Sequence, residues 1–231
     1  MKNRNVTVDL IRTLAIVLMV VFHFIYDLRS FGYVAWDIPD GAGWKQFRYV
    51  ILTLFFICVG IGLAYVHGKQ TQWRGFLRRF MQVSVGAALV TAMSLVMFPK
   101  NWIYFGVLHF IALASLLALP LARRPQVALW FGLLFIAAFN MGWISSRWPF
   151  IYIGQWLPSY ANDFVPIIPW FGVVCLGIFL GHSRWLARDP LGMIKLKRWQ
   201  AWPGKHSLLV YLIHQPILIG LLTVFNYLMV K

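Results

Sequence analysis

The stretch VDLIRTLAIVLMVVFHFIYDL, residues 8–28, is apolar enough to enter a lipid bilayer, yet it contains Asp9, Arg12, His23 and Asp27. A helix needs about 20 residues to cross a hydrocarbon core about 30 Å thick, and this stretch is long enough. Ionisable groups are costly inside a membrane, and they usually face a partner or a cavity. We therefore expect a membrane-spanning helix that presents a functional polar face.

The composition of the whole chain also predicts a membrane protein. Of its 231 residues, 61% are hydrophobic and only 12% are charged, which is unusual for a soluble protein. The 21 Lys and Arg outnumber the 6 acidic residues, all of them Asp, and give a net charge of +15. In a polytopic protein such an excess marks the cytoplasmic loops, so we expect no nucleic-acid partner. Cys58 and Cys175 lie in apolar runs and are expected to be buried and unpaired.

Apolar runs of spanning length indicate the fold class. We predict an all-α, polytopic transmembrane helix bundle, one domain over residues 1–231, with seven spans near residues 7–28, 46–66, 76–98, 102–121, 126–144, 164–182 and 206–229. Basic residues cluster between alternate spans, at 69–79, 123–124 and 184–205. The positive-inside rule then places the N-terminus in the cytoplasm and the C-terminus outside. The membrane we expect is the bacterial inner (plasma) membrane.

The ionisable groups of the first span share one face. At about 100° per residue they fall within an arc of roughly 60°, and Arg12 and His23 are about 16 Å apart along the helix axis. Asp27 lies one turn beyond His23, where a carboxylate orients an imidazole and stabilises its protonated form. The alternative is that Asp9 and Arg12 form a local ion pair, Asp27 lies among the headgroups, and only His23 is immersed.

Two further histidines are expected at membrane depth. GVLHFIALASLL places His109 in the fourth span, and GKHSLLVYLIHQP places His214 in the seventh. Pro216 frees a backbone carbonyl one turn earlier, so we expect polar surroundings near His214 and Gln215. For His109, a role in helix packing is the preferred interpretation.

Several of these motifs resemble a known family. DLIRTLAIVLMVVFH resembles the opening helix of the membrane acyltransferase-3 family and of the related heparan-alpha-glucosaminide N-acetyltransferase catalytic-domain family. GKHSLLVYLIHQP is similar to their closing motif, and GVLHFIALASLL and PIIPWFGVVCLGIFLG look most like the heparan-type branch. The resemblance implies transfer of an acyl group, with acetyl as the first expectation, from acyl-CoA in the cytoplasm to an outer acceptor, often a sugar. These families have more spans than we count, which leaves a homodimer open.

The donor substrate implied by this resemblance, acyl-CoA, is anionic at its nucleotide end. Its phosphates suit a cytoplasmic vestibule of basic side chains, which we predict to be Arg12, Arg74, Arg78, Arg79 and Lys205. Asp9 and His109 are expected to line the cavity. We expect no metal.

The immersed histidines are the candidates for chemistry. His23 would deprotonate the acceptor or carry the acyl group itself, with Asp27 orienting its ring. His214, with Tyr211 or Gln215, would polarise the thioester carbonyl. The sequence does not identify the acyl group or the acceptor. It also leaves open whether transfer is direct or passes through an acyl-histidine intermediate.

Two other functional classes fit the same pattern. A proton-coupled transporter also has a polar stripe and helices interrupted by proline, although we find no inverted repeat. A catalytically silent membrane scaffold, whose basic loops bind anionic lipid, is the third possibility. Dependence on acyl-CoA distinguishes the enzyme from both.

Overall fold

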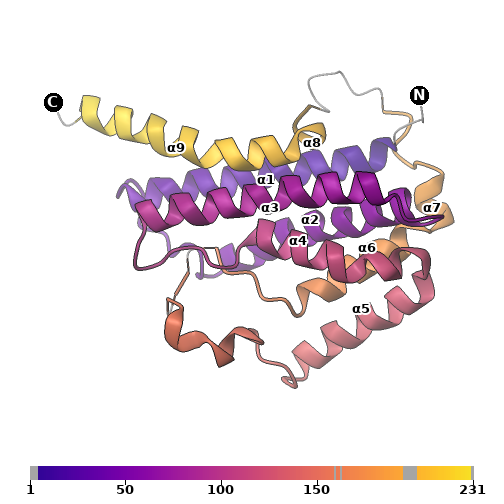
Figure 1. Cartoon of the computed structure of the whole chain (residues 1–231). Helices are drawn as coiled ribbons and strands as arrows, with labels where there is room; N and C mark the ends of the chain where they lie inside the picture. The colour runs from indigo at the N-terminus through magenta and orange to yellow at the C-terminus, as the bar shows by residue number, and fades with distance from the viewer. Residues whose placement is uncertain (1–4, 159, 162, 195–201, 230–231) are drawn as a thin grey trace. The chain divides into compact units, whose positions relative to one another are not determined.

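The structure is a computed structural model that describes residues 5–158, 160–161, 163–194 and 202–229, and every regular element among them is a helix. This confirms the all-α class. The chain forms two compact units, Met1–Phe55 with Asp189–Lys231, and Phe56–Arg188. Figure 1 shows the helices of both units. The single transmembrane domain over residues 1–231 stays a prediction.

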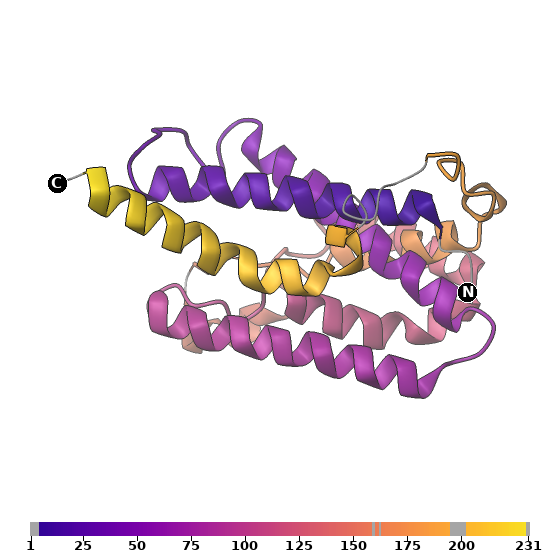
Figure 2. The same ribbon diagram turned by 90° about the horizontal axis from the view of Figure 1, so that it is seen from above.

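The first unit is built on the helix that the opening sequence predicted. It contains α1 (Val6–Ser30), the beginning of α2 (Trp44–His67), α8 (Trp202–Lys205) and α9 (Ser207–Met229). Both α8 and α9 pack against α1, as Figures 1 and 2 show from two directions. Where α1 contacts the beginning of α2, the Phe22 ring of α1 packs edge to face against the rings of Trp44 and Phe47. Such aromatic contacts hold the beginning of α2 against α1.

The N-terminus of α1 is held by a residue far away in the sequence. The carboxylate of Asp189 accepts hydrogen bonds from the backbone N–H groups of Val6 and Thr7, both at 2.8 Å, and from the Thr7 hydroxyl at 2.7 Å. The Thr7 oxygen in turn accepts from the Leu191 N–H at 3.0 Å. These bonds satisfy donors that a helix N-terminus leaves without an intrahelical partner. They tie the chain after α7 to the start of α1.

A close backbone approach holds α8 on α1. Gly204 lies where a Cβ atom would come within 2.6 Å of the Thr13 Oγ1 and 2.9 Å of the Asp9 carbonyl oxygen. Only glycine fits at that distance. The contact places Lys205, the next residue, beside the N-terminal half of α1.

The second unit consists of long and short helices around an aromatic core. Its elements are the rest of α2, then α3 (Trp73–Met97), α4 (Val107–Ala118), η1 (Leu119–Arg123), α5 (Pro125–Asn140), η2 (Phe150–Tyr152), η3 (Gly154–Trp156), α6 (Trp170–Gly181) and α7 (Arg184–Ala187). The Phe56 ring of α2 packs against Phe110 of α4 and Trp170 of α6, with centroids 4.4 Å and 5.6 Å away. Cys58 and Cys175 are buried, and neither forms a disulfide with another described residue, as expected.

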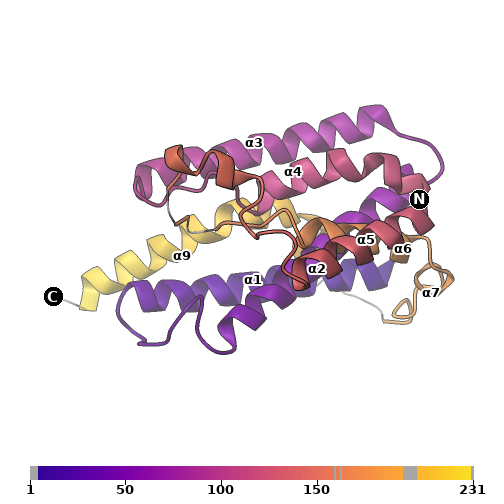
Figure 3. The ribbon, with the colours of Figure 1, turned by 90° about the horizontal axis from the view of Figure 1, so that it is seen from below.

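The contact between α5 and α6, visible in Figure 3, depends on two glycines. A Cβ atom on Gly172 would lie 2.8 Å from the Gly132 carbonyl oxygen, and one on Gly132 would lie 3.0 Å from the Gly172 oxygen. Small residues allow this kind of close packing between apolar helices. The pair therefore brings the two backbones together.

Four of the seven expected spans form helices long and apolar enough to cross a membrane, namely α1, α2, α3 and α9. The others form shorter apolar helices, Val107–Arg123, Pro125–Asn140 and Trp170–Gly181. The expected span 164–182 is shortened at its beginning because Pro166 and Pro169 lack the N–H that a continuing helix needs. The seven-span arrangement and the orientation of the termini stay predictions.

Candidate functional site

Four polar side chains meet where α1 packs against α9 in the first unit. His23 and Asp27 come from α1, and His214 and Gln215 come from α9. Residues four apart lie on one face of a helix, so His23 and Asp27 form two successive layers about 6 Å apart along the axis. His214 joins the first layer and Gln215 joins the second. The structure thus brings together four of the predicted site residues.

The first layer is a pair of imidazole rings. The centroids of His23 and His214 are 4.9 Å apart, with the rings tilted by 59°. The Nδ1 of His214 lies 2.8 Å from the Tyr211 carbonyl oxygen and 3.2 Å from that of Val210. A carbonyl oxygen only accepts, so Nδ1 carries the hydrogen and Nε2 of the neutral ring carries a lone pair. That Nε2 is buried and has no hydrogen-bond partner among the described residues.

The second layer is a carboxylate paired with an amide. Gln215 Nε2 donates to Asp27 Oδ1 at 2.7 Å, and the Asp27 side chain is buried. We had expected Asp27 to orient His23, but the described residues include no hydrogen bond between these two side chains. The Asp27 carboxylate instead accepts a hydrogen bond from Gln215 on the neighbouring helix α9. Gln215 in turn commits one of its two N–H groups to Asp27.

The N-terminal end of the predicted stripe contains a local ion pair. Arg12 Nη1 lies 3.6 Å from Asp9 Oδ1, three residues earlier on α1. This was one of the two interpretations of the sequence. The Arg12 side chain remains 26% exposed, and its guanidinium has five N–H groups in total, more than one carboxylate requires. Lys205 of α8 is exposed and lies on the element packed against this end of α1.

The other predicted vestibule residues, Arg74, Arg78 and Arg79, lie at the beginning of α3 in the second unit, where all three are exposed. The basic segment 184–205 extends partly outside the described residues, which include neither Lys195 nor Lys197. The complete cytoplasmic vestibule stays a prediction.

His109 has a structural role in the second unit. Its Nδ1 accepts from the Gly106 N–H at 3.2 Å, and its Nε2 lies 3.0 Å from the Thr91 hydroxyl. That hydroxyl donates to the Ile103 carbonyl oxygen at 2.8 Å, so Nε2 carries the hydrogen. The Nδ1 thus caps the beginning of its own helix α4 at Gly106, and the Nε2 holds α4 to Thr91 of α3. This fits the helix-packing interpretation, and leaves His109 without a free lone pair for chemistry.

Asp189 is a structural position that the sequence analysis missed. Partial desolvation raises the pKa of this carboxyl, but the hydrogen bonds from Thr7 and Val6 together lower the pKa below its ordinary value of 3.8. Its backbone has a φ of +49°, in the left-handed region that Asp and Asn enter more readily than most residues. The local signal was the sequence Asp189-Pro190, because Asp before Pro favours a turn.

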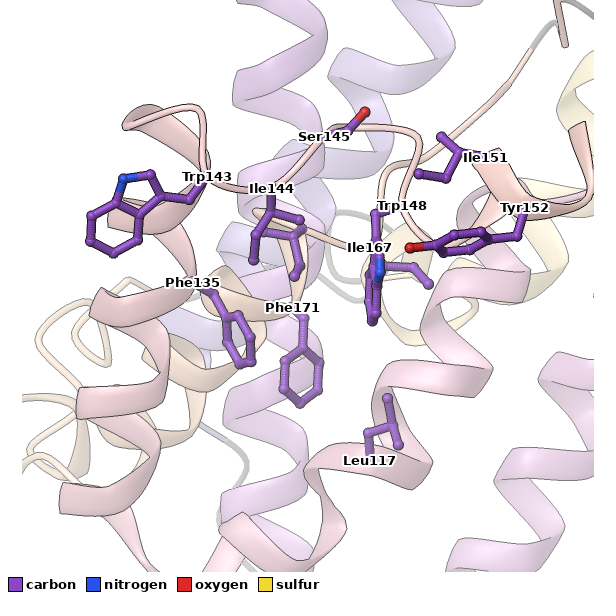
Figure 4. Close-up of a pocket in the computed structure, with 11 residues that line it drawn as sticks. Leu117, Phe135, Trp143, Ile144, Ser145, Trp148, Ile151, Tyr152, Ile167 and Phe171 are labelled. Atoms are coloured by element: carbon purple, nitrogen blue, oxygen red, sulfur yellow. The ribbon is translucent and has the colours of Figure 1, made fainter.

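A pocket of about 600 Å³ lies in the second unit, between α4, α5, α6 and the chain from Trp143 to Tyr152. Figure 4 shows the rings of Phe135 and Phe171 near one another, with Trp148 and Tyr152 on the side of the connecting chain. Nearly all of its lining is apolar, and among the described residues no acid, lysine or histidine contributes to it. The pocket suits an apolar group and offers no acid–base chemistry.

Comparison with known families identifies the chain. The catalytic-domain family of heparan-alpha-glucosaminide N-acetyltransferase matches residues 4–216. Neither curated proteins nor solved structures give a match. The matched region covers most of the chain and includes both layers of the α1–α9 cluster. The chain therefore belongs to this family, which confirms the resemblance seen in its first and last helices.

Proposed function

We propose that this member of the heparan-alpha-glucosaminide N-acetyltransferase catalytic family is a membrane-embedded acyltransferase. It moves an acyl group, acetyl in the first instance, from cytoplasmic acyl-CoA to an acceptor at the outer side of the membrane. The family supports acetyl transfer, and the four long apolar helices support a membrane location. The observation that carries the proposal is the Nε2 of His214, which is buried beside the ring of His23 and has no hydrogen-bond partner in the described part of the chain.

His214 is the proposed general base, and this differs from our sequence-based choice of His23. A base needs a lone pair that is free to take a proton, and the bond from Nδ1 to the Tyr211 carbonyl leaves that lone pair on Nε2. The same carbonyl would stabilise the imidazolium once the proton has arrived. His23, whose ring faces His214, is the proposed donor to the thioester oxygen, a role that Gln215 fills less well because one of its N–H groups serves Asp27.

The acyl-CoA is proposed to enter from the cytoplasmic end of α1. Arg12 and Lys205 lie on packed elements there, and their charges suit the phosphates of the nucleotide. By the rise per residue, Arg12 and His23 are about 16 Å apart along α1, so the extended pantetheine arm would run along the helix toward the histidines. Arg74, Arg78 and Arg79 are proposed as further phosphate ligands.

The test uses purified protein in lipid nanodiscs with radiolabelled acetyl-CoA and a periplasmic glycan extract. We expect label to appear in the extract only when the protein is present, and to be lost in the His214→Ala variant. Protein in vesicles that moves a solute without CoA, and labels nothing, would instead support a transporter. Absence of both activities would support the silent scaffold.

A further inference from the structure

A second pocket of the second unit lies beside two neighbouring arginines. It has a volume of about 460 Å³ between the turn that joins α2 to α3 and the short helix η1. Figure 3 shows α3 beside α4, the helix that leads into η1. The volume is within the range of about 300–1,000 Å³ that is usual for ligand pockets. The lining combines positive charge, a hydroxyl group and an apolar wall, from Thr71, Trp73, Leu119, Pro120, Arg123 and Arg124.

The positive charge of this pocket is not balanced by the protein around it. Among the described residues of the second unit, Asp163 is the sole acid. Its carboxylate accepts from the Val107 N–H at 3.3 Å, at the beginning of α4. η1 follows the other end of this 12-residue helix, about 18 Å away by the rise per residue. Arg123 and Arg124 form no ion pair in the described part of the chain. Their guanidinium groups therefore suit an anion from outside the protein.

Two histidines hold the walls of the pocket in place. On the α2 side, the Nδ1 of His67 accepts from the Gln72 N–H at 3.1 Å, which fixes the turn between α2 and α3. On the η1 side, the Nε2 of His182 donates to the Ala122 carbonyl oxygen at 2.8 Å, directly before Arg123. The backbone on both sides of the pocket is thus fixed by the fold. A preformed site of this kind loses little conformational entropy when its ligand binds.

The apolar side of the pocket continues along α3. The Trp73 ring packs edge to face on Phe76, whose ring packs in the same way on His67. Leu77 and Met81 follow Trp73 about one and two turns later on the same side of the helix, and all three are exposed. Because α3 is long and apolar enough to cross a membrane, such side chains are suited to contact with lipid. A molecule that joins an anion to a hydrocarbon chain matches both parts of this surface.

We propose that this pocket binds an anionic phospholipid of the inner leaflet, with phosphatidylglycerol as the simplest example. The lipid phosphate lies between the guanidinium groups of Arg123 and Arg124, which donate charge-assisted hydrogen bonds to its oxygens. The Thr71 hydroxyl is a further donor to the headgroup, and an acyl chain follows the exposed side of α3 beyond Trp73. Basic pockets at the cytoplasmic end of membrane helices are suited to such headgroups. The site does not depend on the proposed acyl transfer.

The apolar surface favours a phospholipid over acyl-CoA as the occupant. Acyl-CoA also carries phosphates, but the pantetheine arm that follows them contains two amide groups. Amides are costly to place against an apolar surface that offers no hydrogen-bond partner. In a phospholipid the hydrocarbon begins directly after the glycerol esters. Trp73 is also a residue type that is enriched at the level of lipid headgroups.

The test measures lipid binding to the full-length, detergent-solubilised protein by native mass spectrometry. Phosphatidylglycerol and phosphatidylcholine with the same acyl chains are the two probes, so that only the headgroup differs. The pair Arg123→Gln with Arg124→Gln removes both charges, and the pair Arg123→Lys with Arg124→Lys keeps them. Arg184→Gln with Arg188→Gln is the matched control, because it removes the same charge from exposed positions that do not line the pocket. Circular dichroism of every variant checks that it is folded.

We expect the wild type to bind phosphatidylglycerol about tenfold or more tightly than phosphatidylcholine, since two cations meet a headgroup of net negative charge. The double Gln variant should lose this preference, and the control should keep it. The double Lys variant should keep part, because an ammonium lacks the planar fork of a guanidinium. A wild-type preference in the double Gln variant, or equal binding of the two lipids by the wild type, would overturn the proposal.

Two measurements on the wild type keep the test decisive even for a variant that does not fold. The preference for phosphatidylglycerol should shrink at high salt, because exposed charges are screened. The protein should also unfold at a higher temperature in phosphatidylglycerol nanodiscs than in phosphatidylcholine nanodiscs, because a ligand of the folded state stabilises it. A preference that salt does not change, or equal unfolding temperatures, would contradict the site.

Acetyl-CoA is the competing occupant, and the same variants distinguish it from the lipid. We expect the double Gln variant to bind acetyl-CoA as tightly as the wild type does, and excess acetyl-CoA to leave phosphatidylglycerol bound. If acetyl-CoA displaces the lipid from the wild type and no longer binds the double Gln variant, the pocket belongs to the donor substrate and the lipid site is refuted. None of these measurements requires acyl transfer, so their outcome is separate from that of the proposed function.

Discussion

His23 of α1 and His214 of α9 face one another with their ring centroids 4.9 Å apart. They are 191 residues apart in the sequence. His23 lies one turn before Asp27 on α1, and His214 directly precedes Gln215 on α9, where Gln215 is hydrogen-bonded to Asp27. The contact between the first and last long helices of the chain therefore carries two polar layers within an apolar surface. Because each layer uses one side chain from each helix, neither helix contains the complete site.

The two histidines are expected to differ in their effect on catalysis. Replacing His214 by Ala removes the proposed base, and general bases typically contribute about 10²- to 10⁴-fold to a rate. We expect kcat to fall by about that factor, while acyl-CoA affinity changes little because its phosphates bind near Arg12. His23→Ala is expected to lower kcat less, since it removes a hydrogen-bond donor and leaves the base. Single-turnover transfer of labelled acetyl groups measures both, and a larger loss in His23→Ala would return the role of base to His23.

The sequence predicted which residues face the site better than it predicted their partners. Helical periodicity places His23 and Asp27 on one face of α1, and both lie in the cluster. Periodicity says nothing about how α9 is rotated against that face. The structure shows Gln215 next to Asp27, so the carboxylate is bonded across the contact and not along its own helix.

The limits of local sequence patterns also explain why the sixth span is predicted too long and why the role of Asp189 is not predicted. Hydropathy alone extended the sixth span back to residue 164, because Ile167 and Ile168 are apolar, but the prolines at 166 and 169 end the helical pattern there. Asp189 caps the beginning of α1 by accepting from the N–H groups of Val6 and Thr7, which lie 183 and 182 residues earlier. Local spacing cannot reveal a cap supplied by a distant segment.

Asp189 makes the stability of the first unit depend on pH. Its folded pKa is below 3.8, so the ionised form is favoured in the folded state. The stabilisation is present above about 3.8 and is lost as pH falls through the folded pKa. We expect Asp189→Asn to lower the unfolding free energy at pH 7 by less than the roughly 1 kcal/mol that complete loss of a helix cap costs, because Asn keeps one of the two acceptor oxygens.

Thermal unfolding of the detergent-solubilised protein at a series of pH values measures this effect. The difference between wild type and Asp189→Asn should shrink as pH falls from about 5 to below 3.8. Asn suits the test because it tolerates the left-handed backbone conformation that Asp189 adopts. Asp40→Asn, in an exposed ion pair, serves as the control. A difference that stays constant over this pH range would show that the charge of Asp189 is not what stabilises α1.

Gly204 is expected to be intolerant of even the smallest side chain. In Gly204→Ala the new Cβ would meet the Asp9 carbonyl oxygen, which is backbone and cannot rotate away. Overpacking of this kind typically costs about 1–3 kcal/mol, so the unfolding temperature should fall. Gly220→Ala in α9 is the matched control, because nothing lies within 4 Å of its added Cβ. Equal unfolding temperatures for the two variants would mean that α8 does not pack closely on α1.

The orientation in the membrane follows from the basic loops and can be measured directly. We predict that the N-terminus and the loop after α2 face the cytoplasm and that the C-terminus faces outward, since an odd number of spans separates them. Reporter fusions at Gln70 and after Lys231 should therefore report opposite sides. If both report the same side, one of the three shorter helices does not cross the membrane.

Arg12 and Asp9 are expected to affect acyl-CoA binding in opposite directions. Arg12 is the proposed phosphate ligand on α1, and a charge-assisted hydrogen bond contributes about 1.5–3 kcal/mol. Arg12→Ala should therefore weaken acyl-CoA binding by about tenfold or more, since about 1.4 kcal/mol corresponds to a factor of ten. Asp9→Asn should leave the affinity unchanged or increase it, because the Asp9 carboxylate, 3.6 Å from the guanidinium, competes with the phosphate.

Equilibrium binding of acetyl-CoA at low and high salt tests this pair. Loss of Arg12 should also reduce the salt dependence, because fewer charges then take part in binding. Arg147→Ala is the control, since Arg147 lies in a loop that we predict to face the outer side. In an active preparation, Arg12→Ala should raise the KM for acetyl-CoA and leave kcat nearly unchanged, as expected for a contact made equally in the ground state and the transition state. A wild-type affinity in Arg12→Ala would place the nucleotide away from the start of α1, and Arg74, Arg78 and Arg79 would then be the cations to replace.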